Sequence, residues 1–258
     1  METLPLPAVW IKTRCLNIFF LMSNLDNLKR NLRKFERPEK AKILTRFFKT
    51  GKGEYAEGDK FLGLKTDETR SVAARYKDIG YKDIKILLAS EIHEERGVAL
   101  MILSRRFDKA DKSEKEKIYD FYLKNIGGVN NWDLVDGSAP NIVGKYLFES
   151  KASKEFLLDF ARSDNLWKRR IAIMSTFYFI REKDFTTTVK ISEILLNDKH
   201  DLIHKAVGWM LREIGNRNLS IEENFLKIHY KRMPRTMLRY AIEKFPEDRR
   251  KKYLDSKI

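Results

Sequence analysis

A tryptophan and two carboxylates lie close together in a chain that is otherwise strongly basic. They belong to the segment NNWDLVDGSAP, residues 130–140, which holds Trp132, Asp133 and Asp136. On a helix, residues four apart share a face, so the spacing places Asp136 beside the Trp132 indole. A fixed carboxylate can stabilise positive charge on a sugar while its bond to a base breaks, which is the chemistry of glycoside cleavage. We therefore take Asp136 as the candidate catalytic residue.

The charge balance of the chain makes these acids unusual. Lys and Arg total 52 against 37 Asp and Glu, which gives a formal net charge of +15. Such charge favours an anionic partner, with nucleic acid ahead of a membrane surface, because the sequence has neither a long apolar span nor a separate amphipathic basic helix. An acid on a phosphate-binding face works against binding, and such a conflict tends to mark function. The turn formers of DGSAP also allow a structural role for Asp136, and Asp133 is interpreted as pairing with Arg170 or capping a helix.

Trp132 and Trp209 are candidates for contact with a sugar or a base. Their sequence neighbours are polar or small, unlike the setting of most core indoles, although core packing is the alternative. An indole that faces a groove can stack on a base or lie against a sugar. Trp167 and Trp10 are better candidates for the core and the N-terminal tail.

The elements that must position these residues are helices. Gly and Pro number only 12 and 6, and apolar residues recur at helical spacing in segments such as EKEKIYDFYLKNI and DFTTTVKISEILL. The exception is KTGKGEYAEGDKFLGLK, residues 49–65, which is rich in glycine and charge and has no apolar period. We predict a long loop there, and long ordered loops in compact domains are often functional.

A repeat organises the helices. Four similar segments each carry a basic residue before a small and apolar run, at Arg96, Arg170, Lys205 and Arg239, with separations of 74, 35 and 34 residues. Because 74 is twice 37, a further repeat is predicted near residue 133, where the chain has Asp133. This period is typical of TPR, HEAT and armadillo arrays, and the TPR consensus residues are absent.

Stacked helix pairs of this kind form a curved solenoid in which equivalent positions face the same way. We therefore predict an all-α, HEAT-like helical-repeat fold with a concave basic groove. The groove is predicted to carry cations, two indoles and one acid: Arg170, Lys205, Arg239, Trp132, Trp209 and Asp136. Lys205, Arg212 and Arg239 are the candidates for phosphate contacts, which would make binding salt-dependent; each could instead simply solvate a helix face.

Residues 22–258 are predicted to form one domain, with Met22 as the natural start and residues 1–21 as an extension without a role in the fold. Lys12 and Arg14 precede an apolar run, as in a signal peptide, but no small-residue cleavage site follows, so secretion is the less favoured alternative. The single cysteine, Cys15, lies in this extension, which excludes a disulfide framework, thiolate zinc sites and a cysteine nucleophile elsewhere. This usage fits a reducing cytoplasm, where a nucleic-acid partner implies association with the nucleoid.

No metal or cofactor is expected. The sequence has neither the H-x-E and P-C-x-x-C pattern of zinc nucleobase deaminases nor the G-x-x-x-x-G-K-[ST] pattern of P-loop enzymes. His200 and His204, in HDLIH, could bind a metal, but without further ligands in register a surface or capping role is favoured.

Several segments, in order, resemble the AlkD-like DNA alkylation repair glycosylases, a family of HEAT-like repeat proteins. They are FFKTGKGEYAEGDKFLGL, NNWDLVDGSAP, NLWKRRIAIMSTFYFI, NDKHDLIHKAVGWMLRE and MPRTMLRYAIEKF, and the resemblance extends from Pro38 to Leu254. It implies hydrolysis of the N-glycosidic bond of positively charged alkylpurines, chiefly 7-methylguanine and 3-methyladenine, in double-stranded DNA. It also implies a monofunctional enzyme of base excision repair that uses no metal and does not flip the base into a pocket.

Carried over by position, the resemblance implies roles for five residues. The family's catalytic aspartate corresponds to Asp136, its two sugar-contacting tryptophans to Trp132 and Trp209, and its active-site arginine to Arg170. The aromatic residue of the N-terminal helix that approaches the lesion corresponds more loosely to Phe47, where some members have tyrosine. The glycine-rich segment fits one branch of the family, and the sequence offers no physical account of its role.

A rival hypothesis from another class is a non-catalytic HEAT-repeat scaffold that binds DNA or an acidic protein through the same groove, since fold alone does not decide function. The set of Trp132, Asp136, Arg170 and Trp209 discriminates between the two hypotheses, because a generic scaffold has no reason to hold these four together. In either case we expect a monomer without membrane contact.

Overall fold

The computed structural model describes residues 23–256 and Ile258. The predicted extension of residues 1–21, with its cysteine and its tryptophan, lies outside the described residues. The described part of the chain is a succession of α-helices without a β-strand; an isolated bridge pairs Lys60 with Ile92. None of these helices is both long enough and apolar enough to cross a membrane.

The α-helices have the following bounds: α1 (Asn24–Arg33), α2 (Pro38–Phe47), α3 (Thr66–Arg75), α4 (Tyr81–Leu88), α5 (His93–Lys109), α6 (Lys112–Lys124), α7 (Trp132–Ala139), α8 (Lys145–Ser150), α9 (Glu155–Ala161), α10 (Leu166–Arg181), α11 (Thr186–Ile194), α12 (Asp201–Gly215), α13 (Leu219–His229), α14 (Arg235–Ala241) and α15 (Glu247–Leu254). A π-helical turn, Pro140–Gly144, joins α7 to α8.

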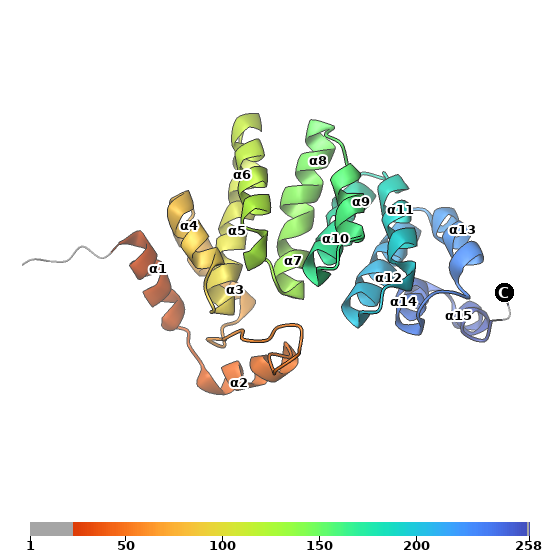
Figure 1. The fold of residues 1–258 in the computed structure, drawn as a ribbon, viewed down its shortest axis with the longest axis horizontal. Coiled ribbons are helices and arrows are strands. Elements are labelled where there is room, and N and C mark those ends of the chain that lie inside the picture. Colours follow the sequence, from red (N-terminus) through yellow and green to blue (C-terminus); the bar gives the residue numbers. More distant parts are fainter. Residues whose placement is uncertain (1–22, 257) are drawn as a thin grey trace, which may run out of the picture.

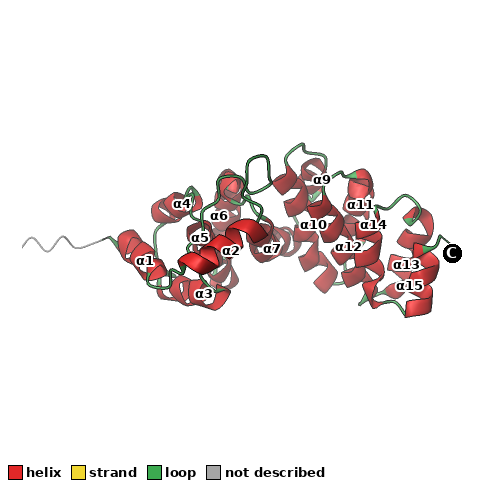
Figure 2. Cartoon of the chain, turned by 90° about the horizontal axis from the view of Figure 1, so that it is seen from below, coloured by secondary structure: helices red, strands yellow, loops and turns green. Residues whose placement is uncertain are grey.

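The helices pack in two layers, as the repeat spacing predicts. The inner helices α5, α7, α10, α12 and α14 contact one another in succession, and the outer helices α4, α6, α8, α9, α11 and α13 pack against them. Figure 1 shows the helices following one another in a curved row, with α2 apart from them across the lower edge. Seen from below in Figure 2, α2 lies in front of α5 and α7. The prediction of an all-α helical-repeat fold is confirmed.

A continuous core runs along the inner layer. One apolar side chain from each inner helix is fully buried: Ile102, Val135, Ile173, Val207 and Met237. Because each helix pair covers the apolar face of the next, burial of this row stabilises all the repeats together.

The equivalent residues of the predicted repeat lie on successive inner helices, but they differ in how deeply they are buried. Arg96, Asp133, Arg170 and Lys205 lie in the first or second turn of α5, α7, α10 and α12, and Arg239 lies in the last turn of the short α14. Arg96 and Arg170 are buried, whereas Arg239 is exposed and Lys205 is partly exposed. Of the three cations predicted to lie along one groove, Arg170 and Lys205 line the same cavity and Arg239 does not, because register sets the face of a helix and not the packing around it.

Polar caps start three of these helices at the same edge. Asn131 accepts a hydrogen bond from the backbone N–H of Trp132, and Asn165 accepts bonds from the backbone N–H groups of Trp167 and Lys168. His200 caps α12 by accepting a bond from the backbone N–H of Leu202. The caps satisfy amides that have no partner within their helix and so set where each helix begins.

A glycine allows the two C-terminal inner helices to approach closely. A Cβ atom on Gly208 of α12 would stand 2.4 Å from the Met237 carbonyl oxygen and 2.5 Å from the Tyr240 Cβ of α14. Only a residue without a side chain permits this contact, which also sets the position of the neighbouring Trp209.

The glycine-rich segment of residues 49–65 is a loop, as predicted, and it is anchored to the repeats. Glu94 of α5 accepts hydrogen bonds from the backbone N–H groups of Leu62, Gly63 and Leu64 at 3.0, 2.9 and 3.2 Å. Gly63 has a φ of 84°, and a Cβ there would stand 2.4 Å from the Arg37 carbonyl oxygen. Glycine is therefore required at the point where the loop passes the start of α2.

Candidate active site

A cavity of about 730 Å³ is lined by residues of α2, the 49–65 loop and the inner helices α7, α10, α12 and α14. Six of the eight predicted site residues line it: Phe47, Trp132, Asp136, Arg170, Lys205 and Trp209. They come from four helices and from positions as far apart in the sequence as Phe47 and Trp209. The repeat therefore brings together side chains that only stacking of the helices can unite.

Asp136 is a partly buried carboxylate, with a side chain 15% exposed, and it is held by an arginine. The Nε and Nη2 groups of Arg170 donate to its two oxygens at 2.8 and 2.7 Å, and Nη1 of Arg170 donates to the Leu202 carbonyl at 2.5 Å. Burial raises the pKa of the Asp136 carboxyl, and the charge and hydrogen bonds of Arg170 oppose that shift. A two-point contact of this kind fixes the plane of the carboxylate at the cavity wall.

Arg170 itself is only 4% exposed, and three of its nitrogens already donate within the protein. This burial argues against the phosphate contact expected from its place in the repeat. The arrangement suits a residue that orients Asp136, because the guanidinium faces the carboxylate rather than the solvent.

Trp132 forms a wall between two cavities. Its ring stacks on Phe48 at a centroid distance of 5.3 Å and an angle of 16°, and it meets Phe47 edge-on at 6.1 Å. On its other side, with Phe47 and Trp132 shared, lies a second cavity of about 830 Å³ against α3 and α5. The indole is only partly buried and lines both cavities.

Trp209 lies on α12 and lines the same cavity as Trp132. Its indole N–H donates to Glu213 on the same helix at 3.2 Å, and its ring meets Phe177 of α10 at 5.8 Å. Trp209 is partly buried against the core, as the alternative of core packing predicts. It also lines the cavity. Trp167, a predicted core residue, is likewise partly buried against the core.

Asp133 has a structural partner that the sequence did not indicate. It does not pair with Arg170; its Oδ2 faces Nε2 of His93 at 2.8 Å, and its Oδ1 accepts the Leu134 backbone N–H at 2.9 Å. Nδ1 of His93 faces Asp59 of the loop at 3.3 Å. The two carboxylates raise the pKa of His93 to about 9 against the opposing effect of its burial, so both ring nitrogens donate at neutral pH.

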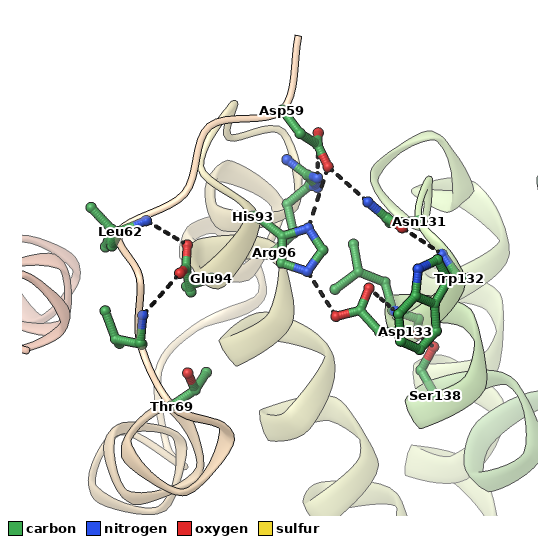
Figure 3. Close-up of polar contacts among 12 residues, drawn as sticks. Asp59, Leu62, Thr69, His93, Glu94, Arg96, Asn131, Trp132, Asp133 and Ser138 are labelled. Carbon is green, nitrogen blue, oxygen red and sulfur yellow. Dashed lines mark hydrogen bonds and ion pairs between the residues drawn. The ribbon is translucent and has the colours of Figure 1, made fainter. Parts of the chain in front are cut away.

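Asp59 connects this histidine to two further groups. It accepts hydrogen bonds from Arg96 at 2.6 Å and from the Asn131 side chain at 3.1 Å. Figure 3 shows these contacts running from the loop through α5 to the first turn of α7, where Trp132 begins the helix. The loop is thus tied to the helix that carries Trp132 and Asp136.

The predicted phosphate contacts divide into two groups. Lys205 lines the cavity and pairs with Asp201 at 2.7 Å while its side chain stays 41% exposed. Arg212 pairs with Glu243, has a side chain only 17% exposed and does not line the cavity. Arg239 is exposed on α14 but also stands outside the cavity lining. The structure therefore favours Lys205 over Arg212 for contact with a polyanion.

Sequence reasoning missed several residues that line the cavity, namely Lys49, Tyr55, Lys199, His200 and Tyr240. The unusual composition of the 49–65 loop was the one available signal for the first two. His200 uses its Nδ1 to cap α12, and Nε2 of His204 lies 2.5 Å from the Asp198 carbonyl. Both histidines of HDLIH therefore bond to backbone groups, in agreement with the capping role favoured from the sequence.

Together these features define a helical-repeat protein whose stacked inner helices carry an aromatic cavity with an oriented, partly buried carboxylate. The chain matches the family described as DNA alkylation repair enzyme over residues 28–245. It therefore belongs to the family of DNA alkylation repair enzymes. Its role is accordingly in the repair of alkylated DNA.

A solved structure supports the same fold. The chain is similar to a predicted DNA alkylation repair enzyme from Enterococcus faecalis, with a TM-score of 0.66 and 16% sequence identity over 82% of this chain and 97% of that chain. At this identity the likeness concerns the fold alone. A search of curated proteins gave no match.

Proposed function

We propose that the protein is a DNA glycosylase that hydrolyses the N-glycosidic bond of positively charged alkylpurines, chiefly 7-methylguanine and 3-methyladenine, in double-stranded DNA. The observation that carries this proposal is the placement of Asp136, oriented by Arg170, in one cavity with Trp132 and Trp209. Family membership supports DNA as the partner.

In the proposed reaction the alkylated purine leaves with the electron pair of the glycosidic bond, which neutralises its positive charge. Because this leaving group needs little acid catalysis, stabilisation of the sugar is the main task. Trp132 and Trp209 present their faces to the deoxyribose, and Asp136 stabilises the oxocarbenium ion and orients a water molecule, which adds to C1′ and releases a proton. Arg170 is a positioning residue that holds the carboxylate.

The cavity also offers contacts for the DNA backbone. Lys49 and Lys199 are exposed at its rim, and Lys205 is partly exposed there. Phe47, 60% exposed at the end of α2, faces the same space and is the proposed contact to the damaged nucleotide. The reaction needs no base pocket, because the target of the carboxylate is the sugar rather than the base.

The test uses duplex DNA with a single 7-methylguanine and measures abasic sites by alkaline strand cleavage under single-turnover conditions. The wild type is expected to produce abasic sites. Asp136→Asn should bind the duplex with nearly unchanged affinity and excise on the order of 10²–10³ more slowly, because a fixed electrostatic contact to the transition state is lost.

Asp120→Asn is the matched control, since Asp120 is exposed on α6 and lines none of the cavities described above. It should excise at the wild-type rate. Excision by Asp136→Asn as fast as by the control would refute the assignment of Asp136. Tight DNA binding without any abasic product from the wild type would favour the non-catalytic scaffold.

A further inference from the structure

The two residues that flank Trp132 in the sequence are both bonded to one buried pair of side chains. Nδ2 of Asn131 donates to Asp59 of the loop at 3.1 Å, and Asp133 faces Nε2 of His93 at 2.8 Å. Asp59 and His93 contact each other at 3.3 Å, and the side chain of each is only 7% exposed. The Asp59–His93 pair therefore holds the backbone on both sides of Trp132 (Figure 3).

Asn131 connects Asp59 to the backbone of Trp132. Its Oδ1 accepts the Trp132 backbone N–H at 2.8 Å, while its Nδ2 is fixed by Asp59. Asn131 is 0% exposed, so water does not compete for either bond. A carboxylate of the loop thus sets the start of α7 and the direction in which the Trp132 side chain leaves the helix.

A stack of rings connects the same histidine to the indole itself. The Trp132 ring stacks on Phe48 at a centroid distance of 5.3 Å, and Phe48 stacks on Phe61 of the loop at 5.0 Å and 22°. Phe61 stacks in turn on the imidazole of His93 at 4.6 Å and 24°. The charge of the protonated imidazole attracts the face of Phe61 and anchors that end of the stack. His93 therefore reaches Trp132 through its side chain as well as through its backbone.

The Asp59–His93 pair is itself firmly supported. Arg96 donates to Asp59 at 2.6 Å. Lys60, the next residue of the loop, donates its backbone N–H to the Glu91 carbonyl at 3.0 Å and accepts the His93 backbone N–H at 2.8 Å. A positioning contact is only as rigid as its own support, and here backbone and side-chain bonds join the loop to the start of α5.

Trp132 depends on such contacts because it is the first residue of α7. The amides of a first helical turn have no carbonyl partner within the helix, so external groups must fix them. Trp209 differs, since it lies in the middle of α12 and its position follows from the regular hydrogen bonds of that helix. Of the two indoles that line the cavity, Trp132 is therefore the one whose place is set by the loop.

We propose that Asp59 and His93 are positioning residues of the active site, which hold the Trp132 indole at the deoxyribose of the damaged nucleotide and thereby make the 49–65 loop part of that site. The proposal rests on the glycosylase function proposed above for the catalytic use of Trp132. Neither residue of the pair lines the cavity that holds Asp136, so both act through Trp132 and take no part in bond cleavage.

The proton on His93 allows one ring to serve two carboxylates. The charged groups that face it are Asp59 of the loop, Asp133 of α7 and Arg96 of its own helix, and its pKa is about 9. Loss of the proton leaves one carboxylate without its donor and releases one side of Trp132. The wild-type rate of single-turnover excision, corrected for the reaction without enzyme, should therefore fall as the pH rises through about 9. This measurement needs no variant.

Two variants test the pair directly. Asp59→Asn and His93→Gln each remove one charge and keep a polar side chain of similar size. At neutral pH and saturating protein, both should slow excision of 7-methylguanine by roughly 10- to 100-fold, because small misplacements of a contact near the reacting atoms are costly. DNA affinity, measured separately, should stay near that of the wild type. His93→Gln should also lose the fall in rate near pH 9.

Spectroscopy reports the position of the indole itself. Indole N–H resonances are recorded by ¹H–¹⁵N NMR at neutral pH, and Trp132→Phe assigns the Trp132 signal by its loss. This resonance should shift in Asp59→Asn and His93→Gln, whereas that of Trp209 should stay in place. Circular dichroism and thermal melting establish that each variant is folded.

Asp184→Asn is the matched control. It also removes the acid of an ion pair, since Asp184 accepts from Lys154 at 2.6 Å, but Asp184 lies before the outer helix α11 and lines neither cavity beside Trp132. The control should keep the wild-type excision rate, its fall near pH 9 and the Trp132 resonance.

An unmoved Trp132 resonance in the two variants of the pair would overturn the positioning of the indole. Wild-type excision by Asp59→Asn, or a fall near pH 9 that persists in His93→Gln, would overturn the role of that residue in catalysis while leaving the glycosylase function intact. If the wild type itself excises nothing, the glycosylase function fails and the catalytic part of the proposal fails with it, whereas a shifted Trp132 resonance would still support the positioning of the indole.

Discussion

Asp133 and Asp136 stand three residues apart on α7 and have different roles because of their partners. Asp133 faces the protonated His93 and joins a network that fixes the loop, whereas Asp136 faces Arg170 at the wall of the cavity. At the scale of single residues, the environment of each carboxylate therefore decides whether it serves structure or the proposed chemistry.

The network around His93 predicts a pH-dependent stability. The folded-state pKa of about 9 lies above the ordinary value of 6.5, because Asp59 and Asp133 stabilise the imidazolium against desolvation and the nearby Arg96. The contribution of protonated His93 to the free energy of unfolding is complete below pH 6.5 and is lost as the pH rises through about 9. Chemical denaturation should show a decline over this range of up to about 3 kcal/mol.

His93→Gln tests whether His93 causes this decline in stability, because glutamine is uncharged throughout that pH range. The variant should be less stable at pH 6 and should approach the wild type as the pH rises. If the two proteins lose the same free energy of unfolding between pH 6.5 and 9, another group is responsible for the decline.

At the scale of the elements, the site depends on how closely the inner helices approach one another. Trp209 and Tyr240 line the cavity from α12 and α14, and these helices meet where Gly208 leaves room for the backbone of α14. The capped starts of α7, α10 and α12 lie at the same edge, where the partial positive charge of helix N-termini favours anions. The stacking of the helices thus sets both the shape and the electrostatics of the site.

Gly208→Ala is expected to destabilise the protein by about 1–3 kcal/mol, because the new methyl group must displace α14. Thermal and chemical denaturation measure the loss, and excision should also slow since Trp209 is the next residue. Gly137→Ala is the matched control: Gly137 lies on α7, and a methyl group added there would have no neighbouring atom within 4 Å, so alanine should be neutral or stabilising. Equal stability of the two variants would mean that the α12 and α14 contact is looser than described.

At the scale of the whole molecule, the basic residues that give the net charge of +15 have two different roles. Buried cations such as Arg96 and Arg170 hold carboxylates within the repeats, whereas exposed lysines at the cavity rim remain for a polyanion. Only the second group can displace counterions from DNA.

Replacing Lys49, Lys199 and Lys205 together with glutamine should weaken DNA binding and make it less dependent on salt. If each lysine contacts a phosphate, the slope of log K against log salt should fall by roughly 0.9 per lysine. Fluorescence anisotropy with an undamaged duplex at several salt concentrations measures this slope.

The matched control replaces Lys112, Lys124 and Lys190 on the outer helices, which are also exposed. Its slope should stay closer to that of the wild type. Equal losses in the two triple variants would mean that DNA responds to the total charge rather than to the cavity rim.

Much of the architecture could be predicted from the sequence. Helical periodicity and the spacing from Arg96 to Arg239 indicated stacked helix pairs, because both signals are local or repetitive and survive without knowledge of the chain path. The same register placed Trp132, Asp136 and Trp209 on one side of the inner helices, and they line one cavity.

Only the tertiary structure decided how deeply each of these residues is buried and which side chains it contacts. The pairings of Arg170 with Asp136, of Asp133 with His93 and of Asn131 with Asp59 join segments 34 to 72 residues apart. Periodicity tells which face of a helix a residue occupies, but its desolvation and its partners depend on how neighbouring helices and the loop close over that face. The acid beside the tryptophan was visible in the sequence; the arginine and the loop that hold the pair in place required the fold.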